Sequence, residues 1–153
     1  MAGKSNVDCL RAFRTYLGAS VVMHFAWEAL QLPFYTIWHT GSSREIAFAV
    51  LHCTAGDLMI ASLSLLAALI LIGDGAWPAE RFIPIMIAAL VIGIGYTVYS
   101  EWLNTSVRKS WGYTELMPTL PWIGTGLSPL LQWLFVPVLA FAVLRRCPRA
   151  RRL

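Results

Sequence analysis

Charged side chains are scarce in this sequence. Only 13% of its 153 residues are Asp, Glu, Lys or Arg, whereas 58% are hydrophobic. A soluble domain of this length has too little interior to bury so much apolar surface. The composition therefore excludes a soluble domain and indicates a polytopic membrane protein.

Cysteine is equally sparse. The chain has three, at Cys9, Cys53 and Cys147, and they lie far apart. Their spacing excludes a disulfide framework and a cysteine-based metal motif, and we expect no bound metal ion.

Long hydrophobic runs are what the sequence has instead. Each of four runs approaches the roughly 20 residues that a membrane-spanning helix needs. They cover about residues 15–38, 46–72, 82–103 and 122–144. We therefore predict an all-α protein with four transmembrane helices in one bundle, as a single domain over residues 1–153.

Prolines and an early aspartate shape our expectations for the first helix. We expect Asp8 to cap its start and Pro33 to kink it, since proline removes a backbone hydrogen bond. In the fourth helix, Pro129 and Pro137 predict an irregular backbone that protein or a cavity must cover.

The basic residues that give the net charge of +4 are unevenly placed around the four runs. Nine flank one end of the predicted bundle: Lys4, Arg11, Arg14, Arg81, Arg145, Arg146, Arg149, Arg151 and Arg152. Only Arg44, Arg108 and Lys109 lie in the other two loops. The positive-inside rule then predicts that both termini and the 73–81 turn are cytoplasmic. This pattern indicates contact with membrane lipids, in a bacterial inner membrane, and not nucleic-acid binding; a homodimer is compatible with it.

Ionisable residues inside the predicted spans carry the functional argument. His24 and Glu28 are four residues apart, so a helix places them on one face, and Asp57 lies near the midplane of the second span. Such groups are costly in hydrocarbon and mark function by default. We predict that His24, Glu28 and Asp57 are catalytic. The alternative is a buried polar pair that only locks one helix against another.

Other polar and aromatic residues cluster at similar depths or further out, while the opposite half of every helix is aliphatic. This asymmetry predicts one pocket, open toward the outer side or the lipid, and argues against a continuous pore. We expect it to be lined by Trp27, His52, Tyr96, Tyr99, Glu101, Gln132 and Trp133. For Tyr99 an ordinary place in an aromatic belt is the alternative. The 105–121 loop is interpreted as a lid over the pocket or as a simple amphipathic connection.

Carboxyl groups in an apolar pocket suit proton transfer on a hydrophobic substrate. A desolvated carboxyl group keeps its proton more readily, so Glu28 or Asp57 would act as a general acid and His24 would relay the proton. Aromatic ring faces would stabilise developing positive charge. We therefore predict double-bond isomerisation or cyclisation of an isoprenoid- or sterol-like molecule, without a cofactor.

Two alternatives from other classes remain open. His24 and His52 differ by only ~5 Å in estimated depth, which is compatible with axial ligation of one b-type haem in a haem- or quinone-binding subunit. The second alternative is a lipid-ligand binding protein or transporter without catalysis.

The polar residues of the first two runs resemble those of the EXPERA family. This family of four-helix membrane proteins includes the emopamil-binding sterol isomerase and sigma-2-receptor-like proteins. His24-x-x-x-Glu28 is similar to the family's His and acidic pair, which acts in proton transfer, and Asp57 is similar to an acidic residue on its second helix. The likeness extends over about residues 20–140 and implies the same fold and an isomerase-like activity.

The last run carries a further part of this resemblance. Trp133 followed by Pro137 is similar to the Trp and Pro of the family's last helix. The sequence departs from the family at Leu130, where the family has an Asn, and Gln132 is the candidate substitute for it. The loop between the first two helices is also shorter here than in the family.

Overall fold

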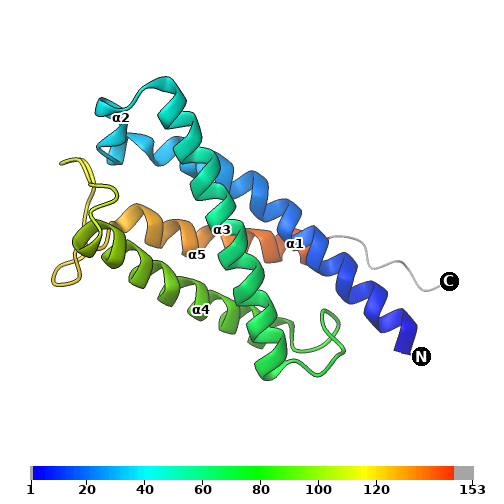
Figure 1. Cartoon of the computed structure of the whole chain (residues 1–153). Coiled ribbons are helices and arrows are strands. Elements are labelled where there is room, and N and C mark those ends of the chain that lie inside the picture. Colours follow the sequence, from blue (N-terminus) through cyan, green and yellow to red (C-terminus); the bar gives the residue numbers. More distant parts are fainter. Residues whose placement is uncertain (1, 147–153) are drawn as a thin grey trace.

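Four long helices form one bundle in the computed structural model, which describes residues 2–146, with side chains from residue 9 onward (Figure 1). They are α1 (Ala2–Gln31), α3 (Ser43–Ile72), α4 (Phe82–Trp102) and α5 (Leu127–Arg146). Three short elements complete the fold: the 3-10 helix η1 (Leu32–Phe34), the helix α2 (Ile37–Thr40) and the π-helix η2 (Leu103–Val107). Residues 2–146 contain no β-strand, so the predicted all-α class is confirmed.

The long helices form a ring in which α1 packs on α3 and α5, and α4 packs on the same two. At one end, which we call the turn end, residues 73–81 join α3 to α4. At the other, the loop end, lie α2 and the loop 108–126, which we call the roof (Figure 1). Backbone hydrogen bonds from Thr36 N to Gly112 O and from Thr114 N to Phe34 O, both 2.9 Å, hold the roof against the connection after α1.

Three of the four predicted spans have the length and composition to cross a membrane: α3, the segment Phe82–Val107, and α5. The helix α1 has 30 residues, as α3 does, but it is not apolar enough to belong to this set. Four spans and the orientation of the termini thus remain predictions. Cys147 and the arginines that follow it lie outside the described residues.

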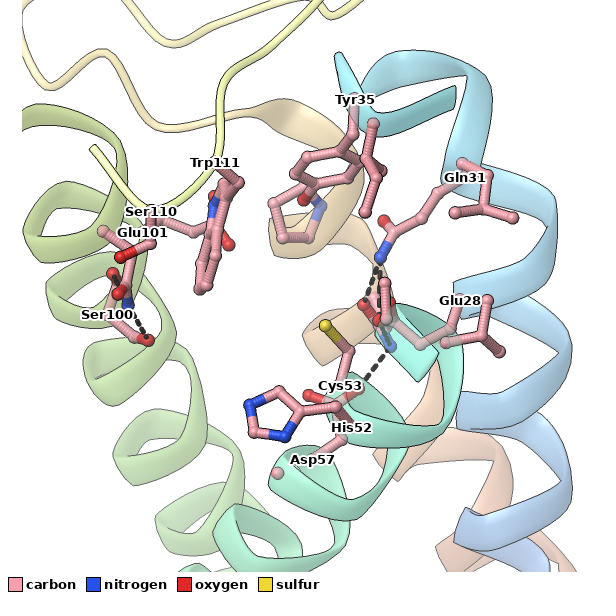
Figure 2. Close-up of a pocket in the computed structure, with 18 of the residues that line it drawn as sticks. Glu28, Gln31, Tyr35, His52, Cys53, Asp57, Ser100, Glu101, Ser110 and Trp111 are labelled. Atoms are coloured by element: carbon pink, nitrogen blue, oxygen red, sulfur yellow. Dashed lines mark hydrogen bonds between the residues drawn. The ribbon is translucent and has the colours of Figure 1, made fainter. Parts of the chain in front are cut away.

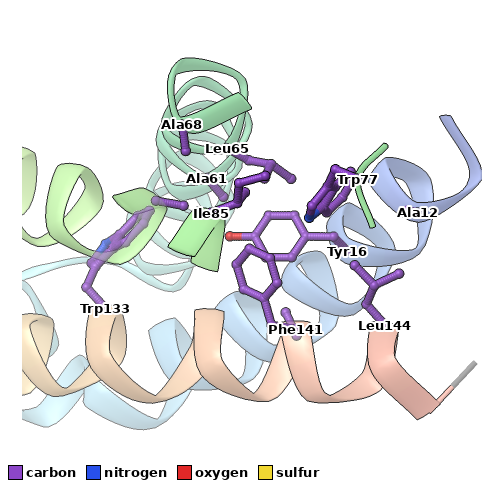
Figure 3. Close-up of a cluster of buried hydrophobic side chains, with 12 residues drawn as sticks. Ala12, Tyr16, Ala61, Leu65, Ala68, Trp77, Ile85, Trp133, Phe141 and Leu144 are labelled. Atoms are coloured by element: carbon purple, nitrogen blue, oxygen red, sulfur yellow. The ribbon is translucent and has the colours of Figure 1, made fainter. Parts of the chain in front are cut away.

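The turn end holds an apolar core in which all four long helices and the 73–81 turn meet (Figure 3). The ring of Tyr16 packs on Phe141 with 4.7 Å between ring centroids, and Trp77 covers this pair from the turn. Fully buried alanines such as Ala61 and Ala140 allow the helix backbones to approach closely. This core holds the helices together at the turn end. The buried polar residues lie nearer to the loop end.

The boundaries of α1 differ from the sequence prediction at both ends. The helix starts at Ala2, so Asp8 lies inside it and is not its cap. It ends at Gln31, so Pro33 terminates the helix instead of kinking it, and Tyr35 has an extended backbone. The physical reason is that Pro33 cannot donate the backbone hydrogen bond that would continue the α-helix, and the chain passes into the 3-10 helix η1 instead.

The other long helices lie close to their predicted ranges. The helix α3 begins at a capping box in which Ser42 N donates to Glu45 Oε2 (2.8 Å) and Ser42 Oγ accepts from Glu45 N (3.4 Å). In α5, Pro129 lies in the first turn, where its missing N–H costs nothing, and Pro137 lies inside the helix on its buried face.

Candidate functional site

A buried polar cluster lies at the centre of the bundle, where side chains from α1, α3 and α5 meet. Its core consists of His24, Glu28, Gln31, Asp57 and Gln132, all of which are buried. The residues of α1 reach this point because Ser20, His24 and Glu28 follow one another at four-residue spacing, and Gln31 continues the same face. One face of α1 is therefore polar where it meets the bundle.

Gln132 connects the three ionisable groups. Its Nε2 lies 2.9 Å from Glu28 Oε1, 2.8 Å from Asp57 Oδ2 and 3.0 Å from His24 Nδ1. An amide nitrogen carries only two hydrogens, so it cannot donate to three acceptors. The cluster is satisfied when one of the three groups holds a proton of its own, and His24 Nδ1 lies 3.3 Å from Asp57 Oδ2, within reach for such a donation.

A chain of neutral donors holds Glu28 from the loop side. Trp27 Nε1 donates to Ser128 Oγ (3.2 Å), and Ser128 Oγ donates to Gln31 Oε1 (2.8 Å). Gln31 Nε2 then donates to Glu28 Oε1 (2.7 Å). Each polar atom in this chain has a partner, which fixes the Glu28 carboxyl group in one position.

Trp133 and His24 hold Asp57 from the other side. Trp133 Nε1 donates to Asp57 Oδ1 (3.3 Å), and its ring lies 5.3 Å from the His24 ring, centroid to centroid. His24 is completely buried, and its Nε2 has no hydrogen-bond partner among the described residues. His24 therefore contacts Asp57 through Nδ1 only and has one nitrogen free.

A cavity of about 950 Å³ opens beside the cluster, between α1 and α3 on one side and α4 on the other (Figure 2). Glu28, Asp57 and Gln132 form its polar end, and apolar side chains such as Met59 and Ile60 line the α3 wall. Trp111 of the roof and Tyr35 lie over it (Figure 2). A cavity of this size, lined by both apolar and polar side chains, is large enough for a small molecule.

A third buried carboxyl group, Glu101 of α4, faces the same cavity from the wall opposite Glu28 (Figure 2). The hydroxyl of Tyr113 donates a short hydrogen bond to Glu101 and accepts one from Gly126 N (3.0 Å). Burial and the neighbouring Glu101 raise the pKa of Tyr113, so its phenol stays protonated at neutral pH. Glu101 thus attaches the roof to α4.

The structure brings most of the predicted site residues together. Seven of the ten line the cavity: Glu28, His52, Asp57, Tyr96, Glu101, Gln132 and Trp133. The other three do not. His24 lies behind Asp57 and Gln132, Trp27 acts through Ser128, and Tyr99 is exposed and packs against Tyr96 and Trp102.

Three important residues were not among the predicted site residues. Gln31 bridges Glu28 and Gln132, and its place on the face of Glu28 was a usable signal, since the two are three residues apart. Tyr35 and Tyr113 pair with 5.5 Å between ring centroids. Their contact joins the end of α1 to the roof, and no spacing in the sequence indicates it.

The histidines do not form a pair. His52 is exposed on α3 and stacks on Phe48, whereas His24 is buried against Trp133. Two axial haem ligands must face one another across the porphyrin, and this arrangement lends the haem alternative no support. Within residues 2–146, no three His, Cys, Asp or Glu residues gather in a way that would hold a metal ion.

Comparison with known proteins adds no relative, because no family model, curated protein or solved structure matches the chain.

Proposed function

We propose that this protein is an integral membrane enzyme that carries out proton transfer on a hydrophobic, isoprenoid- or sterol-like substrate. One observation carries the proposal: Glu28 and Asp57, from two helices, are joined by the amide of Gln132 at the polar end of a mostly apolar cavity. Two carboxyl groups held this way in a buried site can share and exchange one proton.

The same proposal makes α1 the fourth span. Its outward side chains are apolar, with Val22 67% and Leu30 79% exposed, while its polar residues point into the bundle. Such a helix suits a membrane because lipid meets only its apolar face, even though the polar face lowers its overall hydropathy. We place the protein in a bacterial inner membrane with the turn end in the cytoplasm, as the positive-inside rule favours.

The substrate would reach the cavity sideways, from the lipid. The roof covers the loop end and is hydrogen-bonded to the segment after α1. The cavity wall between α3 and α4 includes exposed side chains such as Met59 and Tyr96, which lipid would contact. A hydrophobic substrate would move between these helices without crossing water.

Proton transfer at this site balances without an oxidant or a cofactor. A proton from the Glu28–Asp57 pair adds to one carbon of a double bond and leaves a carbocation on the other carbon. A proton is then lost to the pair from the next carbon along, and the double bond moves by one position. The cluster recovers its proton, and no electrons are gained or lost.

Neighbouring groups would assist this cycle in different ways. Trp133 is part of the cavity wall, where its ring would stabilise the carbocation. His24 does not line the cavity, so it acts as a positioning residue that exchanges a proton with Asp57. The residues that resemble the EXPERA family, namely His24, Glu28, Asp57 and Trp133, are all in this cluster, and on that basis we also propose an EXPERA-like fold and isomerase activity.

Deuterium transfer tests the proposed function without knowledge of the product. The purified protein is reconstituted in lipids extracted from its native membrane, incubated in D₂O, and the lipids are analysed by mass spectrometry. We expect one isoprenoid- or sterol-like species to gain deuterium at carbon. Glu28→Gln and Asp57→Asn should each lower this rate by about 100-fold or more, as for loss of a general acid or base.

Glu80→Gln is the matched control, because Glu80 is an exposed carboxylate in the 73–81 turn and far along the chain from the cavity-lining residues. It should keep the full rate. Size-exclusion profiles and circular dichroism would show that all variants fold. A full exchange rate in both Glu28→Gln and Asp57→Asn would disprove the proton-transfer role. If the unaltered protein showed no exchange, only the alternative of a non-catalytic lipid-ligand binding protein would agree with the result.

A further inference from the structure

Two arginines from separate segments stand at the rim of the cavity. Arg44 lies in the first turn of α3, and Arg108 follows η2 at the start of the roof; both are exposed and line the cavity. Within residues 9–146, no hydrogen bond or ion pair joins either guanidinium group to another group. The nearest acid in sequence, Glu45, uses its carboxylate on the backbone N and Oγ of Ser42, at 2.8 and 2.7 Å.

These arginines stand out against the distribution of charge in the chain. Basic residues concentrate at the turn end, where Arg81 is paired with Asp74 (3.3 Å) and bonded to Ile72 O (3.0 Å). The loop end holds only Arg44, Arg108 and Lys109. Two of these three line the cavity. Guanidinium groups without a protein partner at a cavity rim are well suited to a phosphate or carboxylate.

The cavity extends along α3 from these arginines to the acids. Arg44 and Asp57 lie on one helix, 13 residues apart in number (57 less 44), which is about 20 Å along its axis. Between them the cavity wall includes the apolar Phe48 and Val50, the small Gly56, and the polar Glu45, His52 and Cys53. This distance exceeds half of the ~30 Å hydrocarbon core of a bilayer, so the path suits a long chain.

We propose that the substrate is an amphiphile with an anionic head group and a long isoprenoid-like chain. Arg44 and Arg108 bind the phosphate or carboxylate head, and the chain runs along α3 so that a double bond reaches Glu28 and Asp57. This inference rests on the proposed function and narrows its substrate class. It disfavours a neutral sterol-like molecule, which has no anionic group to pair with two guanidinium groups.

Binding of two matched probes tests the head-group site. Geranylgeranyl monophosphate and geranylgeraniol have the same chain and differ only in the anionic head. Their affinity for the full chain in a neutral detergent is measured by tryptophan fluorescence, since Trp111 and Trp133 line the cavity. We expect the phosphate to bind about a hundredfold more tightly than the alcohol, because each of the two arginines contributes about tenfold, the effect of one hydrogen bond to a charged group.

Arg44→Gln and Arg108→Gln should each remove about tenfold of the affinity for the phosphate and leave that for the alcohol unchanged. Lys109→Gln is the matched control, because Lys109 neighbours Arg108 but does not line the cavity. It should change neither affinity. An equal loss in Lys109→Gln and Arg108→Gln would overturn the proposal, since general surface charge would then account for it.

Competition identifies the source of the anion. Inorganic phosphate and phosphatidylglycerol should displace the probe only at much higher concentrations. Displacement by either at the concentration at which geranylgeranyl monophosphate itself binds would overturn the proposal, in favour of a simple anion site or a site for bulk lipid. Equal binding of both probes, or of neither, would overturn it as well.

Failure of this inference can be told apart from failure of the proposed function. Deuterium exchange that requires Glu28 and Asp57, together with no preference for the phosphate, would support the proposed function and contradict the anionic head group of the substrate. A phosphate preference that requires both arginines, with exchange unaffected in Glu28→Gln and Asp57→Asn, would support the anionic head group and contradict the proton-transfer role of the two carboxyl groups.

Discussion

Gln132 shows how one neutral side chain can set the chemistry of a buried site. Its amide nitrogen faces two carboxyl groups and an imidazole, and it has one hydrogen too few for the three of them. The remaining contact has to be made by a proton on one of those groups. A neutral imidazole already carries one such proton, so His24 can complete the hydrogen bonding of the cluster through Nδ1–H to Asp57 Oδ2 (3.3 Å).

Substitution of single histidines, His24 on α1 and His52 on α3, gives a first testable prediction. His24→Ala removes one buried partner from Asp57 and one from Gln132, and we expect a loss of about 1–3 kcal/mol in the free energy of unfolding. His52→Ala removes an exposed ring and should cost less than about 0.5 kcal/mol. Unfolding of both variants in detergent, followed by circular dichroism, checks the difference.

The deuterium exchange rate should also differ between His24→Ala and His52→Ala. His24→Ala should slow exchange, whereas His52→Ala should change it little because His52 makes no contact with the carboxyl groups. Equal effects of the two substitutions on exchange would contradict the role of His24 as a positioning residue. They would instead agree with the haem alternative, in which both histidines are equivalent, and a Soret absorbance band would then be expected.

At the scale of elements, the close approach of α4 and α5 decides where Trp133 lies. A Cβ atom at Gly93 would overlap the indole ring of Trp133, so only glycine lets this ring reach its position beside Asp57. The sequence shows Gly93 and Gly95 as equivalent helix glycines. The structure distinguishes them, since a Cβ atom at Gly95 would meet nothing within 4 Å.

Substitution of these two glycines tests the packing. Gly93→Ala should destabilise the protein by about 1–3 kcal/mol, because the ring of Trp133 must move in a packed interior. Its displacement should also alter the tryptophan emission spectrum. Gly95→Ala is the matched control and should be neutral or slightly stabilising, since alanine favours a helix. Equal stability of the two variants would show that Trp133 does not pack on Gly93.

Much of this architecture follows from the sequence, and the exceptions have physical reasons. Length and hydropathy predict α3, α4 and α5 well, and the four-residue spacing of His24 and Glu28 places both on the inner face of α1. Inner and outer faces of α3 and α4 are harder to tell apart, because in a membrane both faces are apolar and the helical period of hydrophobic residues is weak. The prediction therefore grouped the exposed Tyr99 with residues that line the cavity.

The end of α1 and the roof show a second reason. Pro33 was expected to kink a continuing helix, but with the roof bonded to the carbonyl groups of Pro33 and Phe34 the chain turns away instead. Those bonds come from Thr114, about 80 residues further along the chain. Local sequence predicts a local backbone preference, whereas a contact of this range depends on the whole fold.

For the whole molecule, the decisive question is whether α1 crosses the membrane. Ala12 near the start of α1, Trp77 of the turn and Leu144 near the end of α5 pack in one core at the turn end. Four spans agree with this packing, because they place the start of α1 and the end of α5 on the same side of the membrane. If α1 did not cross, Cys9 would lie on the side of the roof. The number of spans and the orientation of the molecule are therefore tested by the same experiment.

Single cysteines provide this test. With the other cysteines replaced, a membrane-impermeant maleimide is applied to intact cells that carry Lys109→Cys in the roof, Glu80→Cys in the 73–81 turn, or the native Cys9. Lys109→Cys should react at once, because the positive-inside rule predicts the roof on the outer side, whereas Glu80→Cys and Cys9 should react only after permeabilisation. Reaction of Cys9 in intact cells together with Lys109→Cys would show that α1 does not span. Reaction of Cys9 and Glu80→Cys without Lys109→Cys would agree with four spans in the opposite orientation. Arg44 and Arg108 would then face the cytoplasm, and the substrate would enter from the inner leaflet.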